Sequence, residues 1–327
     1  MRCITLAIEL QQLGWNCVFA CAPKEFHIPE ALLGGRFPCF KLSGNLTIDT
    51  ALLANLPSHT ADLLIVDHYD WTADHEAACY SWAKNILAID DLANRTHSAD
   101  ILLDQTFGRT QADYADLVKH STKLLLGSEY ALLRNEFREL RATALKRRKQ
   151  FNGVKRVLVN FGGADRHNMT SLALEAIKVS GLNIHVDVII GQAAQNVKSV
   201  KQELKSLPQT TSLHVATHDM GKLMAQADIA IGANGTTSWE RCCLGLPSLT
   251  ICTAENQRKI SNQLSMAGAA IVMGEVGNID RNIIANHLEW LLHNPEKLSE
   301  MSRSAALICD GNGARRIAEE IARESAR

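Results

Sequence analysis

The chain alternates short apolar runs with longer stretches of helical periodicity. Short runs rich in β-branched residues, separated by helices, are typical of parallel α/β sheets. Two such sets occur, so we expect an α/β fold of two Rossmann-like domains that face a cleft. The first set predicts strands at 17–20, 63–67, 86–89, 101–104 and 124–127, with helices at 74–84 and 110–117. The second predicts strands at 156–160, 186–190, 213–216, 229–232 and 248–251, with helices at 169–180, 194–207, 219–226, 238–244 and 256–267.

The two sets are separated by a charged stretch that contains the basic run Lys146–Lys149. A basic run can bind nucleic acid, but aromatic side chains are not interleaved with this one, which favours a solvated linker. We therefore place the first domain at 1–140, the linker at 141–153 and the second domain at 154–327. The tail from 295 is predicted to form two helices that are broken at 311–313.

The first residues of the chain have helical spacing, with Ile4, Ala7 and Ile8 on one face before Gly14. In a doubly wound domain the first strand is central and precedes the first helix. The sequence therefore predicts that the first strand of the N-terminal domain is missing from this chain. The two strands that would flank it are then expected to lack a partner.

The composition argues against nucleic acid or a membrane as a binding partner. Lys and Arg number 34 and Asp and Glu number 35, so no overall basic field attracts nucleic acid or an anionic membrane. The apolar runs are shorter than a membrane helix needs, and the N-terminus lacks the pattern of a signal peptide. The nine cysteines are scattered, which predicts reduced thiols and a cytoplasmic protein. Cys242 and Cys243 are adjacent, which favours packing over a zinc site.

One stretch of the second domain is typical of a phosphate-binding turn. The predicted strand at 229–232 leads into small residues, and hydroxyl side chains then open a helix. The N–H groups and dipole of a helix start favour a diphosphate, although the same hydroxyls can simply cap the helix. One turn later, Glu240 could accept hydrogen bonds from a ribose diol or be an ordinary surface residue. The candidate diphosphate ligands here are Gly235, Thr236, Thr237 and Ser238.

Two further turns follow predicted strands of the same domain. Gly162 and Gly163 follow 156–160, where paired glycines allow backbone amides to approach a ligand; a plain tight turn is the alternative. Asn256 and Gln257 follow 248–251 and could hold sugar hydroxyls or N-acyl groups, or could only cap the next helix.

In the first domain, polar clusters follow two predicted strands, at the edge where α/β folds bind ligands. His68 is a candidate general base, although a structural or positioning role is favoured. Asp90 and Asp91 are adjacent on one strand end, so their side chains should point to opposite sides. A metal ion shared by the two carboxylates is therefore not expected.

In combination, seven motifs resemble a known family. They are Asp67-His68-Tyr69, Ile89–Ala93, Ala99–Gln105, Gly127–Arg134, Phe161–Asp165, Trp239-Glu240 and Glu255-Asn256-Gln257. Together they resemble the UDP-2,4-diacetamido-2,4,6-trideoxy-β-L-altropyranose hydrolases of pseudaminic acid biosynthesis (the PseG family), from residue 1 to about residue 270. The resemblance implies the two-domain GT-B fold.

The resemblance also implies an inverting hydrolysis. Water attacks the anomeric carbon, UDP departs, and free 2,4-diacetamido-2,4,6-trideoxy-L-altrose continues toward the sugar used in flagellin glycosylation. On this chain, Gly162, Gly163 and the helix start at 236–238 would hold the diphosphate, Glu240 the ribose, and Asn256 the sugar near its reacting carbon. Tyr69 would lie on the first-domain side. The expected partner is a UDP-sugar, bound by a monomer without a metal or cofactor, because GT-B enzymes stabilise the leaving diphosphate with a helix terminus.

One part of the family pattern is absent. The family begins with a strand and a Gly-x-Gly-His loop whose histidine is the expected general base, and this sequence begins just after that loop. We therefore expect reduced or absent hydrolysis by the chain as it stands, with His68 only a weak substitute. Two alternatives stay open: a GT-B glycosyltransferase that uses a UDP-sugar, and a non-catalytic nucleotide-sugar binder.

Overall fold

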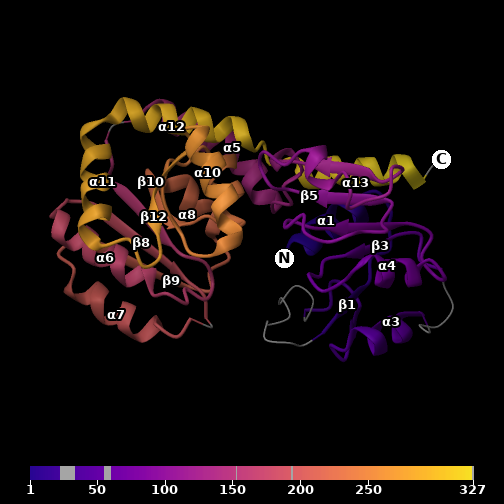
Figure 1. Cartoon of the computed structure of the whole chain (residues 1–327). Helices are drawn as coiled ribbons and strands as arrows, with labels where there is room; N and C mark the ends of the chain where they lie inside the picture. The colour runs from indigo at the N-terminus through magenta and orange to yellow at the C-terminus, as the bar shows by residue number, and fades with distance from the viewer. Residues whose placement is uncertain (23–33, 55–59, 152, 193, 326–327) are drawn as a thin grey trace. The chain divides into compact units, whose positions relative to one another are not determined.

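The computed structural model describes residues 1–22, 34–54, 60–151, 153–192 and 194–325. The chain divides into two compact units (Figure 1). Unit 1 comprises Met1–Arg134 and Asn312–Arg327, and unit 2 comprises Asn135–Gly311.

Unit 2 is built on one parallel six-stranded sheet in the order β12-β11-β10-β7-β8-β9. The chain runs outward from β7 on one side and from β10 on the other, so the order reverses between these two strands. Ligands of doubly wound sheets bind at the carboxyl ends of the strands beside such a reversal. The strands are β7 (Arg156–Asn160), β8 (His185–Ile190), β9 (Thr210–Val215), β10 (Ile229–Ala233), β11 (Ser248–Cys252) and β12 (Ala270–Glu275).

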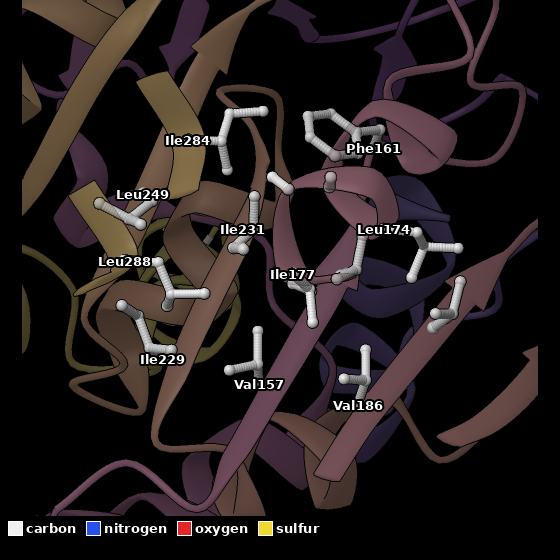
Figure 2. Packing of buried hydrophobic residues seen from close by; sticks show 14 of the residues in the cluster. Val157, Phe161, Leu174, Ile177, Val186, Ile229, Ile231, Leu249, Ile284 and Leu288 are labelled. Carbon is white, nitrogen blue, oxygen red and sulfur yellow. The ribbon is translucent and has the colours of Figure 1, made fainter. Parts of the chain in front are cut away.

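Helices cover both faces of this sheet. On one face, α6 (Met169–Ser180) and α11 (Arg281–His293) pack against each other and against alternate apolar residues of the strands (Figure 2). On the other face, β10 lies against α9 (Thr237–Cys243). The remaining helical elements are α5 (Asn135–Lys149), α7 (Val197–Ser206), α8 (Met220–Gln226), η3 (Glu255–Gln257), α10 (Arg258–Met266) and α12 (Pro295–Ile308). The hydrophobic core between the sheet and the helices α6 and α11 includes Val157, Ile177, Val186, Ile231, Leu249 and Leu288, all with 0% exposure.

Unit 1 contains a four-stranded parallel sheet, β3-β4-β5-β6, and a separate parallel pair, β1-β2. The strands are β1 (Phe19–Cys21), β2 (Cys39–Lys41), β3 (Leu64–Val66), β4 (Ile86–Ile89), β5 (Ile101–Asp104) and β6 (Lys123–Leu126). Its helical elements are α1 (Arg2–Gln12), α3 (Leu46–Ala54), α4 (Ala73–Cys79), η1 (Gln111–Tyr114), η2 (Ser128–Tyr130) and α13 (Gly313–Ser325).

The C-terminal helix α13 packs against α1, so the two ends of the described chain share one core (Figure 1). Leu6 and Leu10 of α1 and Ile317 and Ile321 of α13 are buried in it. The helix begins at Gly313, where a Cβ atom would lie 2.3 Å from the carbonyl oxygen of Ala131. A side chain at that position would separate the helix from the chain beneath it.

The N-terminal part of unit 1 contains the helix α1 and the strands β1 and β3. The chain enters helix α1 at Arg2. Within the described residues, β1 is hydrogen-bonded only to β2, and β3 only to β4, so each of these strands has one partnered side.

Two sequence expectations about the domain limits differ from the structure. The stretch predicted as a solvated linker, 141–153, is largely part of α5, which belongs to unit 2. Its basic run is held by internal contacts: Arg148 is buried, with 3% exposure, and Arg147 is paired with Asp228. The tail expected to end the second domain instead places α13 in unit 1. Positions 152, 326 and 327, which fall in the predicted linker and tail, lie outside the described residues.

The predicted helix at 110–117 is only the short turn η1. Tyr114, which ends it, is fully buried and donates its hydroxyl toward Asp90 and Asp104, at 2.9 Å from each. The turn therefore places Tyr114 in a buried polar network with Asp90 and Asp104.

Candidate functional site

The turn after β7 has the shape that paired glycines allow. Gly162 adopts φ +86°, and Gly163 follows it at the surface. Gly191, at the end of β8, approaches so closely that a Cβ atom there would lie 2.1 Å from the carbonyl oxygen of Gly163. Gly162 and Gly163 therefore form a tight turn, which places Gly163 at the carboxyl edge of the sheet.

Asp165 fixes the loop beyond this turn. Its Oδ1 accepts the N–H of Met169 at 2.9 Å, and its Oδ2 accepts the N–H of Thr170 at 3.0 Å. These two bonds satisfy donors at the start of α6, as a capping carboxylate does. Asn196 donates to the same carboxylate at 2.9 Å. Asp165 is thus a structural member of the motif that carries the resemblance.

A surface cavity of about 280 Å³ joins the loop after β7 to the end of β11. Two cationic or titratable side chains, Arg166 and His167, border it from exposed positions. Sequence analysis missed both, although they directly follow the Gly162-Gly163 turn. The complete lining is Phe161, Gly163, Ala164, Asp165, Arg166, His167, Thr253 and Ala254. The arrangement is suited to an anionic group at the carboxyl edge of the sheet.

The predicted diphosphate turn lies between β10 and α9. Thr236 is exposed and Gly235 and Thr237 are half-buried, and the hydroxyl of Thr236 makes no capping hydrogen bond. Ser238 differs from them, because its side chain is fully buried and accepts a hydrogen bond from Arg241 at 3.0 Å. The Ser238 hydroxyl therefore supports the turn from beneath.

Glu240 and the pair Asn256-Gln257 occupy different settings. Glu240 is half-buried on α9. Asn256 is exposed in η3, directly after the end of β11. Gln257 Oε1 accepts both the N–H and the hydroxyl of Thr253, each at 3.1 Å. Gln257 thus fastens its own loop, and Asn256 is the one of the two that faces solvent.

In unit 1, the ends of β3 and β4 bring Tyr69 to Asp91. The Tyr69 hydroxyl donates to Asp91 Oδ2 at 3.2 Å, while the ring remains 52% exposed. Arg2 completes the cluster: it forms two hydrogen bonds with Asp67, at 2.6 and 2.9 Å, and one with Asp91 at 3.3 Å. Burial would raise the pKa of Asp67, but its hydrogen bonds with Arg2 and the charge of that side chain outweigh burial and lower it.

The phenol of Tyr69 stays protonated at physiological pH. Burial, reinforced by the negative charge of Asp91, raises its pKa to about 12. Because its proton is donated to Asp91, the Tyr69 oxygen keeps its lone pairs available to accept a hydrogen bond.

Asp90 and Asp91 point to opposite sides, as their adjacency predicts. Asp90 is buried and binds Arg95 at 2.7 Å and the backbone N–H of Ala93 at 2.9 Å. Asp91 faces Tyr69 and Arg2. Across the described residues, no group of three or more His, Cys, Asp and Glu side chains is arranged to hold a metal ion.

His68 is exposed, and its Nδ1 accepts the backbone N–H of Asp70 at 3.1 Å. In a neutral imidazole that accepts at Nδ1, the proton lies on Nε2, which makes the outward nitrogen a donor. The geometry therefore favours the positioning role for His68 over that of a general base.

Neither a disulfide nor a membrane-spanning helix is found among the described residues. All nine cysteines are free thiols, and Cys242 and Cys243 are buried in packing positions. Among the helices that the structure describes, none combines the length and the apolar character needed to cross a bilayer.

Comparison with known proteins gives the family. The description "Glycosyltransferase family 28 C-terminal domain" matches residues 156–321, half of the chain. An uncharacterized Methanocaldococcus jannaschii protein, MJ1062, is 25% identical over 79% of this chain, which spans 53% of that protein's length. The UDP-2,4-diacetamido-2,4,6-trideoxy-β-L-altropyranose hydrolase of Campylobacter jejuni is 25% identical over 76% of this chain and 86% of its own.

A solved structure shows the fold. The crystal structure of Acinetobacter baumannii MurG matches 98% of this chain and 95% of its own with a TM-score of 0.69, at 16% sequence identity. The expected GT-B type of fold, with two Rossmann-like units, is confirmed. Together with the match over 156–321, this places the chain in the family defined by the glycosyltransferase family 28 C-terminal domain.

Proposed function

We propose that this protein binds a UDP-sugar and hydrolyses UDP-2,4-diacetamido-2,4,6-trideoxy-β-L-altropyranose to UDP and free 2,4-diacetamido-2,4,6-trideoxy-L-altrose, with inversion. One observation carries the proposal. The Phe161–Asp165 motif of the resemblance and the residues just before the Glu255–Gln257 motif border one cavity beside Arg166 and His167. The 25% identity to the Campylobacter hydrolase supports the same substrate class. The free thiols support a cytoplasmic location.

In this proposal the diphosphate lies at the carboxyl edge of the unit 2 sheet. Backbone amides of Gly162, Gly163 and Gly235 and the hydroxyls of Thr236 and Thr237 bind its oxygens. Charge at the mouth of the cavity supports this placement, because Arg166 presents a guanidinium there. Ser238 acts indirectly, since its hydroxyl is engaged by Arg241 within the fold.

Glu240 binds the ribose diol, and Asn256 contacts the sugar near its reacting carbon. Gln257 contributes through the loop that it fastens to Thr253. Tyr69 belongs to the sugar side in unit 1, where its phenol oxygen can accept a hydrogen bond from an N–H or O–H group while it donates to Asp91.

The reaction is a displacement at the anomeric carbon. A water oxygen forms a bond to that carbon on the face opposite the nucleotide, and the bond from carbon to the diphosphate oxygen breaks with its electron pair. Negative charge grows on the departing diphosphate, and preorganised donors and cations stabilise it. The attacking water gives up a proton to the surrounding solvent. His68 is a poor acceptor for it because its Nδ1 already accepts the Asp70 N–H.

A second reaction class has its own support. The family description names glycosyltransferases, which pass the sugar to an acceptor other than water. The two reactions differ in one requirement: a hydrolase releases UDP with no acceptor present.

The test is UDP release from the UDP-linked diacetamido sugar in buffer alone, with UDP-N-acetylglucosamine as the control nucleotide-sugar. We expect the chain to release UDP from the first substrate and much more slowly from the second. UDP release only after a saccharide or lipid acceptor is added would overturn hydrolysis in favour of transfer. UDP binding without release under either condition would leave only a nucleotide-sugar binder.

A further inference from the structure

Arg241 is a buried guanidinium directly beneath the loop between β10 and α9. It is 3% exposed, and its Nη2 donates to the carbonyl oxygen of Ala233 at 2.8 Å and to Ser238 Oγ at 3.0 Å. Asn234 Oδ1 lies 3.5 Å from the same nitrogen. One side chain thus contacts the first and last residues of the turn 233–238.

The sheet leaves room for this guanidinium. Gly232, the residue before Ala233 on β10, faces it, and a Cβ atom at that position would lie 3.1 Å from Arg241 Nη1 and 2.3 Å from the carbonyl oxygen of Asn160. A residue with a side chain at 232 would therefore displace either the neighbouring strand or the arginine.

The network continues away from Arg241 through Asn234. This side chain has 0% exposure and donates to Thr250 Oγ1 at 2.9 Å and to Ser261 Oγ at 2.8 Å. These contacts tie the turn to β11 and α10. The position of the turn is therefore set by the interior of unit 2.

The charge of Arg241 is not balanced by a salt bridge. Among the described residues, no carboxylate oxygen lies within ion-pair distance of its guanidinium, and its hydrogen-bond acceptors are neutral. Burial lowers the pKa of Arg241 to about 10, against the weaker opposing effects of Cys242 and Glu240, so the side chain is still protonated at neutral pH. A buried cation without an ion-pair partner is unfavourable unless an anion compensates it.

A second buried arginine of unit 2 lies where the fold itself accounts for its charge. Arg148, also 3% exposed, donates to the carbonyl oxygens of Met224 at 2.9 Å and Ala227 at 3.1 Å, at the C-terminal end of α8. The negative end of a helix dipole explains a cation there. Arg241 belongs to the last turn of α9, but its guanidinium reaches back to the carbonyl oxygen of Ala233 and to Ser238 Oγ at the beginning of the helix, where the helix dipole disfavours a cation.

We propose that Arg241 is a positioning residue for the diphosphate: its buried charge lies beneath the turn 233–238 and favours an anionic ligand on the outer side, while its hydrogen bonds hold the turn in place. This inference rests on the proposed function, because it takes the diphosphate of a nucleotide as that ligand. The nucleoside part of the ligand does not require the charge.

The test compares UDP with uridine by calorimetric titration of the full chain. The variants are Arg241→Met, which removes the charge, Arg241→Lys, which restores a point charge, and Arg148→Met as a control that removes a buried arginine elsewhere. Loss of a charge-assisted contribution predicts that Arg241→Met weakens UDP about tenfold or more and uridine by less than about threefold. Arg241→Lys should recover most of the UDP affinity. Arg148→Met should lower the urea midpoint of unfolding and leave the UDP-to-uridine affinity ratio unchanged.

Equal losses for UDP and uridine in Arg241→Met would overturn the proposal, as would an unchanged UDP affinity. If Arg241→Met does not fold, the UDP-to-uridine affinity ratio is measured on Arg241→Gln instead. The glutamine amide carries no charge but can still donate a hydrogen bond to the Ala233 carbonyl. If wild-type protein binds neither UDP nor the UDP-sugar, the proposed function itself fails. Wild-type binding with an unaltered ratio in the variants refutes only the role of Arg241.

Discussion

Tyr69 donates its hydroxyl to Asp91 at 3.2 Å, although the two residues come from the ends of different strands of unit 1. Asp91 also accepts from Arg2 at 3.3 Å, so the carboxylate is held from two sides. Because the Tyr69 hydroxyl donates its proton to Asp91, the phenol oxygen can serve a ligand only as an acceptor.

We expect Tyr69→Phe to lower kcat for the UDP-linked diacetamido sugar about tenfold or more, because the variant loses this oriented acceptor while it keeps the ring. UDP affinity should change little, since the residue acts on the sugar. Steady-state kinetics and UDP titration measure the two effects. Tyr80→Phe is the matched control: Tyr80 donates to Ser98 O and Asp100 Oδ2, both at 2.9 Å, and its loss should lower stability without altering kcat. Equal kcat values for wild type and Tyr69→Phe would contradict the assignment.

Glu240→Ala should weaken UDP binding about tenfold, because a carboxylate that accepts from a ribose diol forms charge-assisted hydrogen bonds. The same substitution should have a smaller effect on 2′-deoxy-UDP, which lacks one of the two hydroxyls. Glu300→Ala serves as the control, since Glu300 is exposed on α12 and pairs with Lys297 at 3.2 Å. Wild-type UDP affinity in Glu240→Ala would refute the ribose role.

Asn256→Ala should reduce both the affinity for the intact UDP-sugar and its turnover, because the exposed amide contacts the sugar near its reacting carbon. UDP alone should bind to the variant with nearly wild-type affinity. Gln257→Ala, in contrast, releases the loop fastened to Thr253 and should weaken both ligands. The prediction fails if Asn256→Ala weakens UDP as strongly as it weakens the UDP-sugar.

The stability of unit 1 should depend on pH through His97. This buried imidazole lies 2.7 Å from Glu76 Oε1 and 3.8 Å from Asp90 Oδ2. Burial alone would lower the pKa of His97, but these two carboxylates outweigh it and raise the pKa. The stabilisation is therefore complete below the unfolded pKa of about 6.5 and is lost as pH rises through the raised folded pKa.

Hydrogen exchange of the β4 and β5 amides between pH 6 and 9 measures this dependence. We expect protection to fall with rising pH in wild type. His97→Gln should abolish the slope and cost about 3 kcal/mol at low pH, because it leaves the buried carboxylate of Glu76 without a cationic partner. His120→Gln, at an exposed position, should retain the slope. A wild-type profile that is flat over this range would contradict the account.

Sequence pattern predicted most of the sheet because buried parallel strands are nearly continuous apolar runs. β4 and β10, which are buried at every residue, were found with their limits nearly unchanged. β2 was missed because all three of its residues are exposed, so no burial pattern marks it. α11 was missed although its signal was present: Asp280 caps the helix by accepting from Asn282 and Ile283.

For the candidate site, sequence predicted the positions of the turns but not the directions of their side chains. Turns that follow strands could be placed at the carboxyl edge from sequence alone, because parallel strands share that edge. The direction of a side chain within a turn could not, because it depends on tertiary partners. Ser238 points inward because Arg241 lies there, and Gln257 turns back to Thr253. Arg148 and Arg241 act from buried positions, and sequence alone does not show that a charged residue is buried.

The most direct test of the central claim is NMR of the sugar formed when this chain acts on the UDP-linked diacetamido sugar in buffer without an acceptor. The account predicts that UDP is released and that the first sugar anomer to appear has the configuration opposite to that of the substrate. Initial formation of the anomer with retained configuration, or UDP binding with no sugar released, would contradict it.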